Sequence, residues 1–186
     1  MIMTARWAVA AAMGVSLLCG GCASSQKSDR PQTVVFASEM LSTRITRGAT
    51  PVSGFYRAAP DSVWLAIPAA FKDLAFPRGT QTNGAEQLFV TQEMTIQHQL
   101  YDNEPNSLYF DCGRTPAGNA AADEYAVSFT IFARVVPDGD RFSHVDVLVD
   151  GRAHDRTRNN MSAVFCNGKG RLEQMVIDAI RKRLAL

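Results

Sequence analysis

The sequence predicts an α+β fold: a two-layer sandwich in which an antiparallel sheet of about four to six strands is covered by two helices. Between residues 88 and 149, apolar and polar residues alternate over several stretches, as in strands with one buried face. Apolar stripes of helical period flank these stretches, one over residues 63–74 and one over residues 172–180. A sheet with one apolar face needs a cover, and two amphipathic helices supply it.

Two short strands and a helix open the predicted domain. Residues 33–37 and 52–59 have the character of strands. The helix that follows takes Asp61 or Ser62 as its N-cap. Pro68 lies inside this helix and predicts a kink, because proline lacks the amide that would bond to the preceding turn. One face of the helix is apolar, through Val63, Ile67, Phe71 and Leu74.

A meander of about four strands and a second helix complete the domain. The predicted strands cover residues 88–96, 108–112, 125–135 and 145–149. Turn residues at 102–106 and 137–140 separate two pairs of them. The last helix begins near Asn167 or Gly168, and the basic residues of its last turn complement the helix dipole: Arg181, Lys182 and Arg183.

The N-terminus predicts export and lipidation. Residues 1–21 have a positive charge at Arg6 and a twelve-residue apolar run, too short to span about 30 Å of bilayer as a helix. The small residues before Cys22 resemble the lipobox of bacterial lipoproteins, in which the cysteine becomes the acylated N-terminus. The resemblance implies acylation of Cys22 and, because Ala23 follows it, sorting to the outer membrane. Residues 22–32 would then be a flexible tether, and residues 33–186 a single α+β domain.

Two alternatives for the N-terminus remain open. An ordinary secretory signal cleaved near Ala23 would give a secreted or soluble periplasmic protein, and an uncleaved leader would be a membrane anchor. Whether the chain is a lipoprotein or a secreted protein, its remaining cysteines, Cys112 and Cys166, lie in an oxidising compartment. We therefore expect a disulfide between them. The alternative, a reactive pair, lacks the Cys-x-x-Cys spacing.

Composition excludes several protein classes. The 186 residues are 46% hydrophobic and 20% charged, which is typical of neither a fibrous, a disordered nor a polytopic membrane protein. Lys and Arg number 19 and Asp and Glu 18, and the charge is dispersed rather than gathered in a basic stripe, so we expect no nucleic-acid partner.

The segment from Ala59 through Trp64 to Phe71-Lys72-Asp73-Leu74 is similar to the opening helix of the helix-grip domains of BamC, the lipoprotein of the β-barrel assembly machine. The resemblance implies a helix-grip-like fold in an outer-membrane compartment.

Candidate contact residues are mostly basic. Arg152, Arg156 and Arg158 follow the longest strands and could meet an acidic partner or anionic lipid. Lys169 and Arg171 precede the last helix, where free amides favour a phosphate or lipid headgroup. The alternative in both cases is a solvated surface.

Two further candidates are a groove and a metal site. Trp64, one position off its helix's apolar stripe, is expected to be partly exposed and to line a groove. His144, Asp146, Asp150 and His154 resemble a ligand set in type. However, residues four apart on a strand are roughly 13 Å apart, so we expect no metal site.

The motifs of known nucleophiles and cofactors are absent from the sequence. We therefore expect a non-enzymatic, lipid-anchored periplasmic accessory or scaffold lipoprotein without a cofactor. It would be attached to the outer membrane through its lipid and bind a protein partner or another component of the envelope. The alternatives are a binder of a small apolar ligand or lipid in a helix-over-sheet cavity near Trp64, Phe71 and Phe129, an inhibitor of an exported hydrolase that presents residues 113–122, and an unrecognised hydrolase.

Overall fold

The computed structural model describes residues 50–82, 87–101, 103–155 and 163–185, together with the pairing of β1 (Val34–Val35) with β2 (Arg44–Ile45). The described residues all belong to one compact unit, Pro31–Leu186. The predicted signal peptide (residues 1–21), Cys22 and the tether up to residue 32 lie outside the described residues. Arg156 and Arg158 lie outside them as well.

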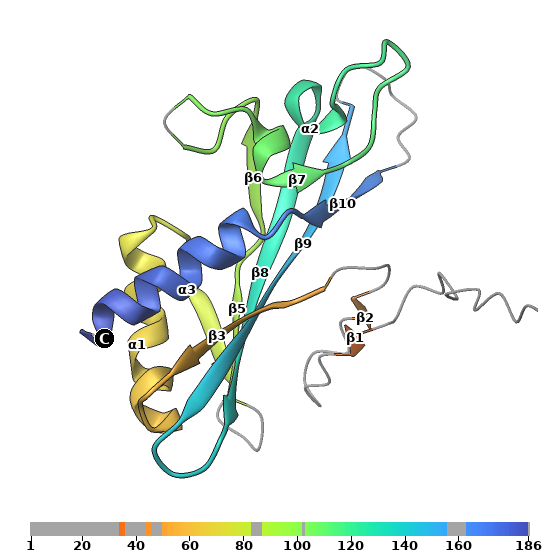
Figure 1. Cartoon of the computed structure of the whole chain (residues 1–186). Coiled ribbons are helices and arrows are strands. Elements are labelled where there is room, and N and C mark those ends of the chain that lie inside the picture. Colours follow the sequence, from red (N-terminus) through yellow and green to blue (C-terminus); the bar gives the residue numbers. More distant parts are fainter. Residues whose placement is uncertain are drawn as a thin grey trace, which may run out of the picture. The chain divides into compact units, whose positions relative to one another are not determined.

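The described fold is α+β with one large antiparallel sheet, as the sequence predicted (Figure 1). Eight strands form this open sheet in the order β4-β5-β8-β9-β10-β7, with β3 paired to β9 and β6 paired to β8. The expectation of four to six strands and two helices was wrong, since the described residues contain these eight strands and three helices.

The elements are β3 (Val52–Tyr56), α1 (Pro60–Asp73), β4 (Gly79–Thr82), β5 (Gln87–Thr91), β6 (Met94–Gln97), a 3-10 turn (Asn106–Leu108), β7 (Phe110–Asp111), α2 (Ala121–Glu124), β8 (Ala126–Pro137), β9 (Ser143–His154), β10 (Val164–Gly168) and α3 (Arg171–Arg183).

A long hairpin, β8 with β9, forms the centre of the sheet. Each strand has twelve residues, and the pairing runs unbroken from Ala126 opposite His154 to Pro137 opposite Ser143. The predicted turn lies between them and is closed by Asp138 N–H, which donates to the carbonyl of Phe142 at 3.0 Å. The odd-numbered residues of β8 from Val127 to Val135 are apolar and lie in the hydrophobic core, so the strongest alternation in the sequence is confirmed.

The strand predicted over residues 88–96 is in fact two strands. Val90 of β5 lies opposite Phe132, whereas Met94 of β6 lies opposite Phe129. Four steps along the chain therefore match three steps on β8, and the extra residue at 92–93 forms a β-bulge. Side chains of equal parity change faces across the bulge: Met94 faces the core and Val90 the opposite side.

Helices α1 and α3 lie side by side and both contact the sheet (Figure 1). Helix α1 begins at Pro60 with Ala59 as its N-cap, two or three residues earlier than expected, so the assignment of Asp61 or Ser62 as N-cap was wrong. Proline suits this position because its missing amide would be unpaired there in any case. The helix continues through Pro68 as one element.

A hydrogen bond connects α3 to β3, and an ion pair connects it to α1. The hydroxyl of Tyr56 donates to the carbonyl of Ile177 at 3.0 Å. Burial raises the pKa of this phenol, and it stays protonated as a donor. At the other end of α3, Arg183 forms an ion pair with Asp73 at the end of α1.

The core contains the helix stripes and one face of the central strands. The opposite face of the sheet also carries buried apolar side chains, contrary to the expectation of a single buried face. These are Leu88, Val90, Phe132 and Leu148, each at most 8% exposed.

Candidate functional site

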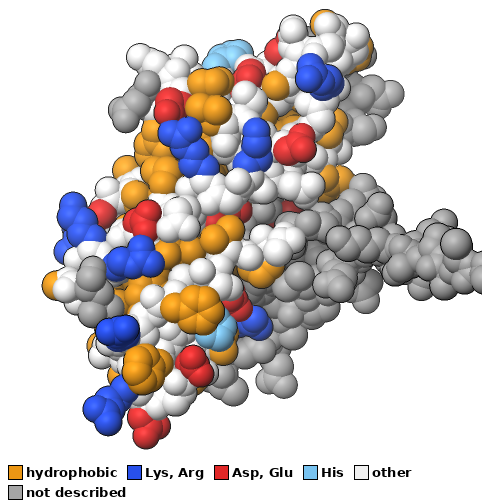
Figure 2. All heavy atoms as spheres, viewed as in Figure 1, with side chains coloured by type: hydrophobic (Ala, Val, Ile, Leu, Met, Phe, Trp, Pro, Cys, Tyr) orange, Lys and Arg blue, Asp and Glu red, His pale blue; other side chains and the backbone are white. Residues whose placement is uncertain are grey.

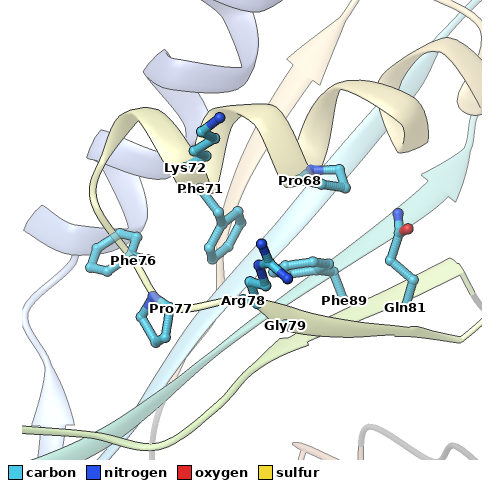
Figure 3. A pocket seen from close by; sticks show the side chains of 9 residues that line it. All are labelled: Pro68, Phe71, Lys72, Phe76, Pro77, Arg78, Gly79, Gln81 and Phe89. Carbon is cyan, nitrogen blue, oxygen red and sulfur yellow. The ribbon is translucent and has the colours of Figure 1, made fainter.

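A pocket of about 450 Å³ opens between the end of α1 and the strands β4 and β5 (Figure 3). This volume lies in the range of small-molecule sites, which is about 300–1,000 Å³. Three phenylalanine rings and two prolines make it mainly apolar. Its nine lining residues are Pro68, Phe71, Lys72, Phe76, Pro77, Arg78, Gly79, Gln81 and Phe89.

The turn after α1 shapes the floor of the pocket. Ala75 has a φ of 57°, which turns the chain back, and Phe76 N–H donates to the carbonyl of Phe71 at 3.0 Å. The rings of Phe71 and Phe76 are 5.8 Å apart, and that of Phe71 is 4.6 Å from Phe89 on β5. These three rings are nearly buried, so they form a fixed apolar floor.

Gly79 allows the backbone of β4 to approach the rings of this floor closely. A Cβ at this position would lie 2.3 Å from Cζ of Phe89 and 2.6 Å from the carbonyl oxygen of Val90. The backbone of β4 is therefore closer to the ring of Phe89 than any other residue type would allow.

The lining includes two cations: Lys72 on α1, whose amine points away from the rings, and Arg78 just before β4, whose guanidinium points toward α1 (Figure 3). Both side chains are exposed, and no carboxylate is found among the described residues that line the pocket. The neighbouring carboxylate, Asp73, is already paired: the hydrogen bond from Arg183 is the main cause that lowers its pKa. The opening is therefore electropositive.

Charge elsewhere on the visible face of the molecule is mixed. Figure 2 shows basic and acidic side chains interspersed, with apolar side chains between them. The local excess of positive charge at the pocket thus differs from a general basic surface.

A second hollow, of about 400 Å³, lies where the start of α1 meets the end of β8. Asp61 and Asp140 line it, and Gln87 donates to Asp61 at 3.0 Å. The charged residues among those described in its lining are the two aspartates, so this hollow is electronegative where the first pocket is electropositive.

The predicted disulfide is present. Cys112, directly after β7, is bonded to Cys166 of β10, and both side chains are buried. The two residues are 54 positions apart in the sequence. The bond therefore fixes the edge of the sheet just before α3.

Two of the predicted basic contact residues have intramolecular partners. The Nζ of Lys169 donates to the carbonyl of Ser107 at 2.9 Å. Arg171 is 2.7 Å from Glu104 and lies over the ring of Tyr109, which also donates to Glu104. The hydrogen bond from Tyr109, and then that from Arg171, lower the pKa of Glu104. These two basic residues therefore pack against the 103–109 loop.

The remaining candidates lie elsewhere. Arg152 stacks on Phe165, with its Cζ 5.5 Å from the ring centroid. Trp64 is only 8% exposed and does not line the pocket, so its predicted partial exposure was wrong. Phe129 packs on Phe110 in the core, 5.0 Å between centroids. Of the three aromatic residues proposed for a cavity, only Phe71 lines the pocket.

The candidate metal ligands do not assemble. Nε2 of His144 is 3.9 Å from Asp146, whose carboxylate already accepts from Arg134 at 2.9 Å and from Ser53 at 2.6 Å. Within the described ranges, no group of three or more His, Cys, Asp or Glu residues is placed to hold a metal ion.

The sequence did not reveal Phe76, Arg78 and Phe89 as pocket residues. The one available signal was Pro77-Arg78-Gly79, a cation between two chain-turning residues after an apolar helix. That signal does not reveal which strand returns below the helix.

In the part of the chain that the structure describes, no helix has the length and apolar character needed to cross a membrane. Comparison with family models, curated proteins and solved structures finds no match to this chain.

Proposed function

We propose that this chain is a non-enzymatic, lipid-anchored accessory protein of the cell envelope. Its folded domain binds another envelope component through the pocket between α1 and β4. The export signal and Cys22 support the anchor, and the outer membrane with the domain facing the periplasm is the proposed location.

The lining of the pocket carries the proposal. Among the described residues that line it are a hydrophobic floor and two cations, but no serine, cysteine, histidine or carboxylate. Such a lining can hold a ligand by apolar contact and charge. It lacks the nucleophile with an adjacent base that covalent catalysis uses.

We also propose that the domain is a two-layer, helix-grip-like sandwich, similar to the domains of BamC. The contacts of α1 with β8 and β9, and of α3 with β9 and β3, support this arrangement. The aromatic floor supports it as well, because Phe71 of the helix packs directly on Phe89 of the sheet.

Affinity purification from native envelopes tests the function. The bait is the full-length acylated chain, and both co-purified proteins and lipids are identified by mass spectrometry. A Gln81→Trp variant blocks the pocket from an exposed strand position, and Cys22→Ala removes the proposed acylation site. We expect a defined envelope component with the parent chain and its loss with Gln81→Trp. Recovery of the same material by both chains would contradict binding through the pocket.

A second candidate function, inhibition of an exported hydrolase, is favoured by the loop after Cys112. Thr115 N–H donates to Asn119 and Gly118 N–H donates to Thr115, so the loop is closed by its own hydrogen bonds. The disulfide at Cys112 and helix α2 hold its two ends. Envelope hydrolases recovered in the same purification, and lost when residues 116–119 are replaced by a Gly-Ser linker, would favour this candidate.

A further inference from the structure

The pocket combines an apolar part, made by rings and prolines, with a positively charged part, and one class of ligand matches both. We infer that the pocket between α1 and β4 binds an amphipathic anion, a single aliphatic chain that ends in a carboxylate or a phosphate. This inference rests on the proposed binding function and names the ligand of the same site.

The apolar half of the pocket fits an aliphatic chain. Phe71, Phe76 and Phe89 are at most 7% exposed, and Pro68 and Pro77 extend their surface toward the opening. Covering this surface with a hydrocarbon removes water from apolar area on both partners. The apolar surface that such a chain would cover is mainly that of the half-buried Pro68 and Pro77, because the rings below them are already nearly closed to water.

The charged half selects the sign of the headgroup. Lys72 and Arg78 have no carboxylate beside them in the lining, and the residue next to Lys72, Asp73, is occupied by Arg183 on α3. A ligand anion at the opening would meet two cations. A cationic headgroup would meet the same two charges and be repelled.

The position of the two cations fixes how the ligand would enter. Phe71 points from α1 toward Phe89, while Arg78 extends along the open side (Figure 3). An aliphatic chain would therefore lie along the rings, with its anionic end near Arg78. The amide of Gln81, on the strand β4 that follows Arg78, can donate to an oxygen of that headgroup.

Photolabelling of the full chain in envelope vesicles tests the inference. The probes are a diazirine-bearing fatty acid and the matched fatty alcohol, and labelled peptides are identified by mass spectrometry. Decanoate, decyl phosphate and decanol serve as unlabelled competitors. We expect the acid to label peptides that contain Phe71, Phe76 or Phe89. Decanoate or decyl phosphate should suppress this labelling, and whichever is stronger identifies the headgroup.

Three variants separate charge from shape. The double variant Lys72→Met, Arg78→Met keeps the side-chain bulk, and we expect labelling to fall by roughly three- to tenfold, the contribution of two partly exposed ion pairs. Gln81→Trp should abolish labelling by filling the opening. Arg57→Met, which removes an exposed cation outside the pocket, should leave it unchanged. Circular dichroism establishes that each variant is folded.

Two results would overturn the inference: equal labelling of the parent and the double Met variant, or equal competition by decanol and decanoate. Absence of label at the pocket while affinity purification still recovers an envelope component, lost with Gln81→Trp, would refute the ligand class but leave the proposed binding function intact. Absence of both would refute both.

Discussion

At the scale of the residue, Asp146 shows how one position joins three strands. It lies opposite Ser53 of β3 and Arg134 of β8 in the register of the sheet, and it accepts hydrogen bonds from both. Its side chain is 10% exposed, whereas that of Arg134 is 30% exposed. The pair is therefore partly screened by water, and its loss should cost less than that of a fully buried pair.

Asp146→Asn should destabilise the domain at neutral pH. The substitution removes the negative charge that Arg134 contacts and weakens the bond from Ser53, so we expect a loss of about 1–3 kcal/mol in the free energy of unfolding. Urea denaturation followed by circular dichroism measures it. Ser53→Ala, which removes one bond and leaves the ion pair, should cost about 1 kcal/mol. An unchanged midpoint for Asp146→Asn would show that the ion pair does not stabilise the fold.

The same variant should have a pH-dependent effect. Burial by itself raises the pKa of Asp146, but the hydrogen bonds from Arg134 and Ser53 outweigh it and lower the pKa overall. A lowered pKa gives stability that is present above the unfolded value, about 3.9, and is lost as pH falls through the folded value. The difference between the parent and Asp146→Asn should therefore shrink below about pH 4. A difference that stayed constant down to pH 2 would argue against the ion pair as its source.

The parent must be compared with its variant because other carboxyl groups change the free energy of unfolding with pH in the opposite direction. Burial raises the pKa of Glu173, although backbone hydrogen bonds partly offset it. The contribution of this group is present at low pH and is lost as pH rises through its folded value. The contribution of Glu173 is the same in the parent and in Asp146→Asn. Subtracting the unfolding free energy of one from that of the other at each pH therefore removes it.

The prediction for Trp64 failed at this scale for a simple reason. The apolar stripe was defined for one buried face, but α1 packs against both the sheet and α3. A helix with two neighbours buries a wider arc than one with a single neighbour. A residue one position off the stripe is then buried as well.

At the scale of the element, the bulge between β5 and β6 explains why one predicted strand became two. Leu88, Val90, Met94 and Ile96 lie at even positions, so an alternating pattern assigns them to one face of a single strand. The alternation gives the period of each strand but not its register against β8. Only the pairing shows that one residue is extra and that the buried face changes there.

The contact of β3 with α3 should depend on Gly54. A Cβ at this position would lie 2.5 Å from Cγ2 of Ile177, so α3 would have to move away from the strand. We expect Gly54→Ala to destabilise the domain by about 1–3 kcal/mol through overpacking. Thermal unfolding by calorimetry measures the change.

Two companion variants test this cause. Shortening the partner, in Gly54→Ala with Ile177→Val, should recover part of the loss. Gly118→Ala adds a Cβ where nothing lies within 4 Å, but at a φ of 90°. Its cost should be that of backbone strain alone and should not respond to Ile177→Val. Equal responses of the two glycines would rule out the steric explanation.

At the scale of the whole molecule, the disulfide connects distant parts of the chain. It joins the region after β7 to β10, which leads directly into α3. Because α3 also contacts β3 and α1, the bond restrains the unfolded chain over much of the sequence that forms the core.

Reduction of the disulfide should lower stability without removing the fold's other contacts. The two cysteines are 54 residues apart, and a loop of this size predicts a loss of about 4 kcal/mol on the chain-entropy estimate. Urea unfolding with and without dithiothreitol measures it. The double variant Cys112→Ala, Cys166→Ala should resemble the reduced protein and be insensitive to reductant. Equal stability of the oxidised and reduced chains would contradict a stabilising bond.

The sequence by itself determined the fold class, the long central hairpin, the two long helices and the pairing of Cys112 with Cys166. These depend on local periodicity, turn residues and the number of cysteines, which can be counted along the chain. The tertiary structure alone decided the strand count, the bulge and the pocket. Phe71, Arg78 and Phe89 meet there from a helix, a turn and a strand, and their meeting depends on strand register and helix packing. Those are long-range properties, set by which surfaces bury each other rather than by the order of residues in any one segment.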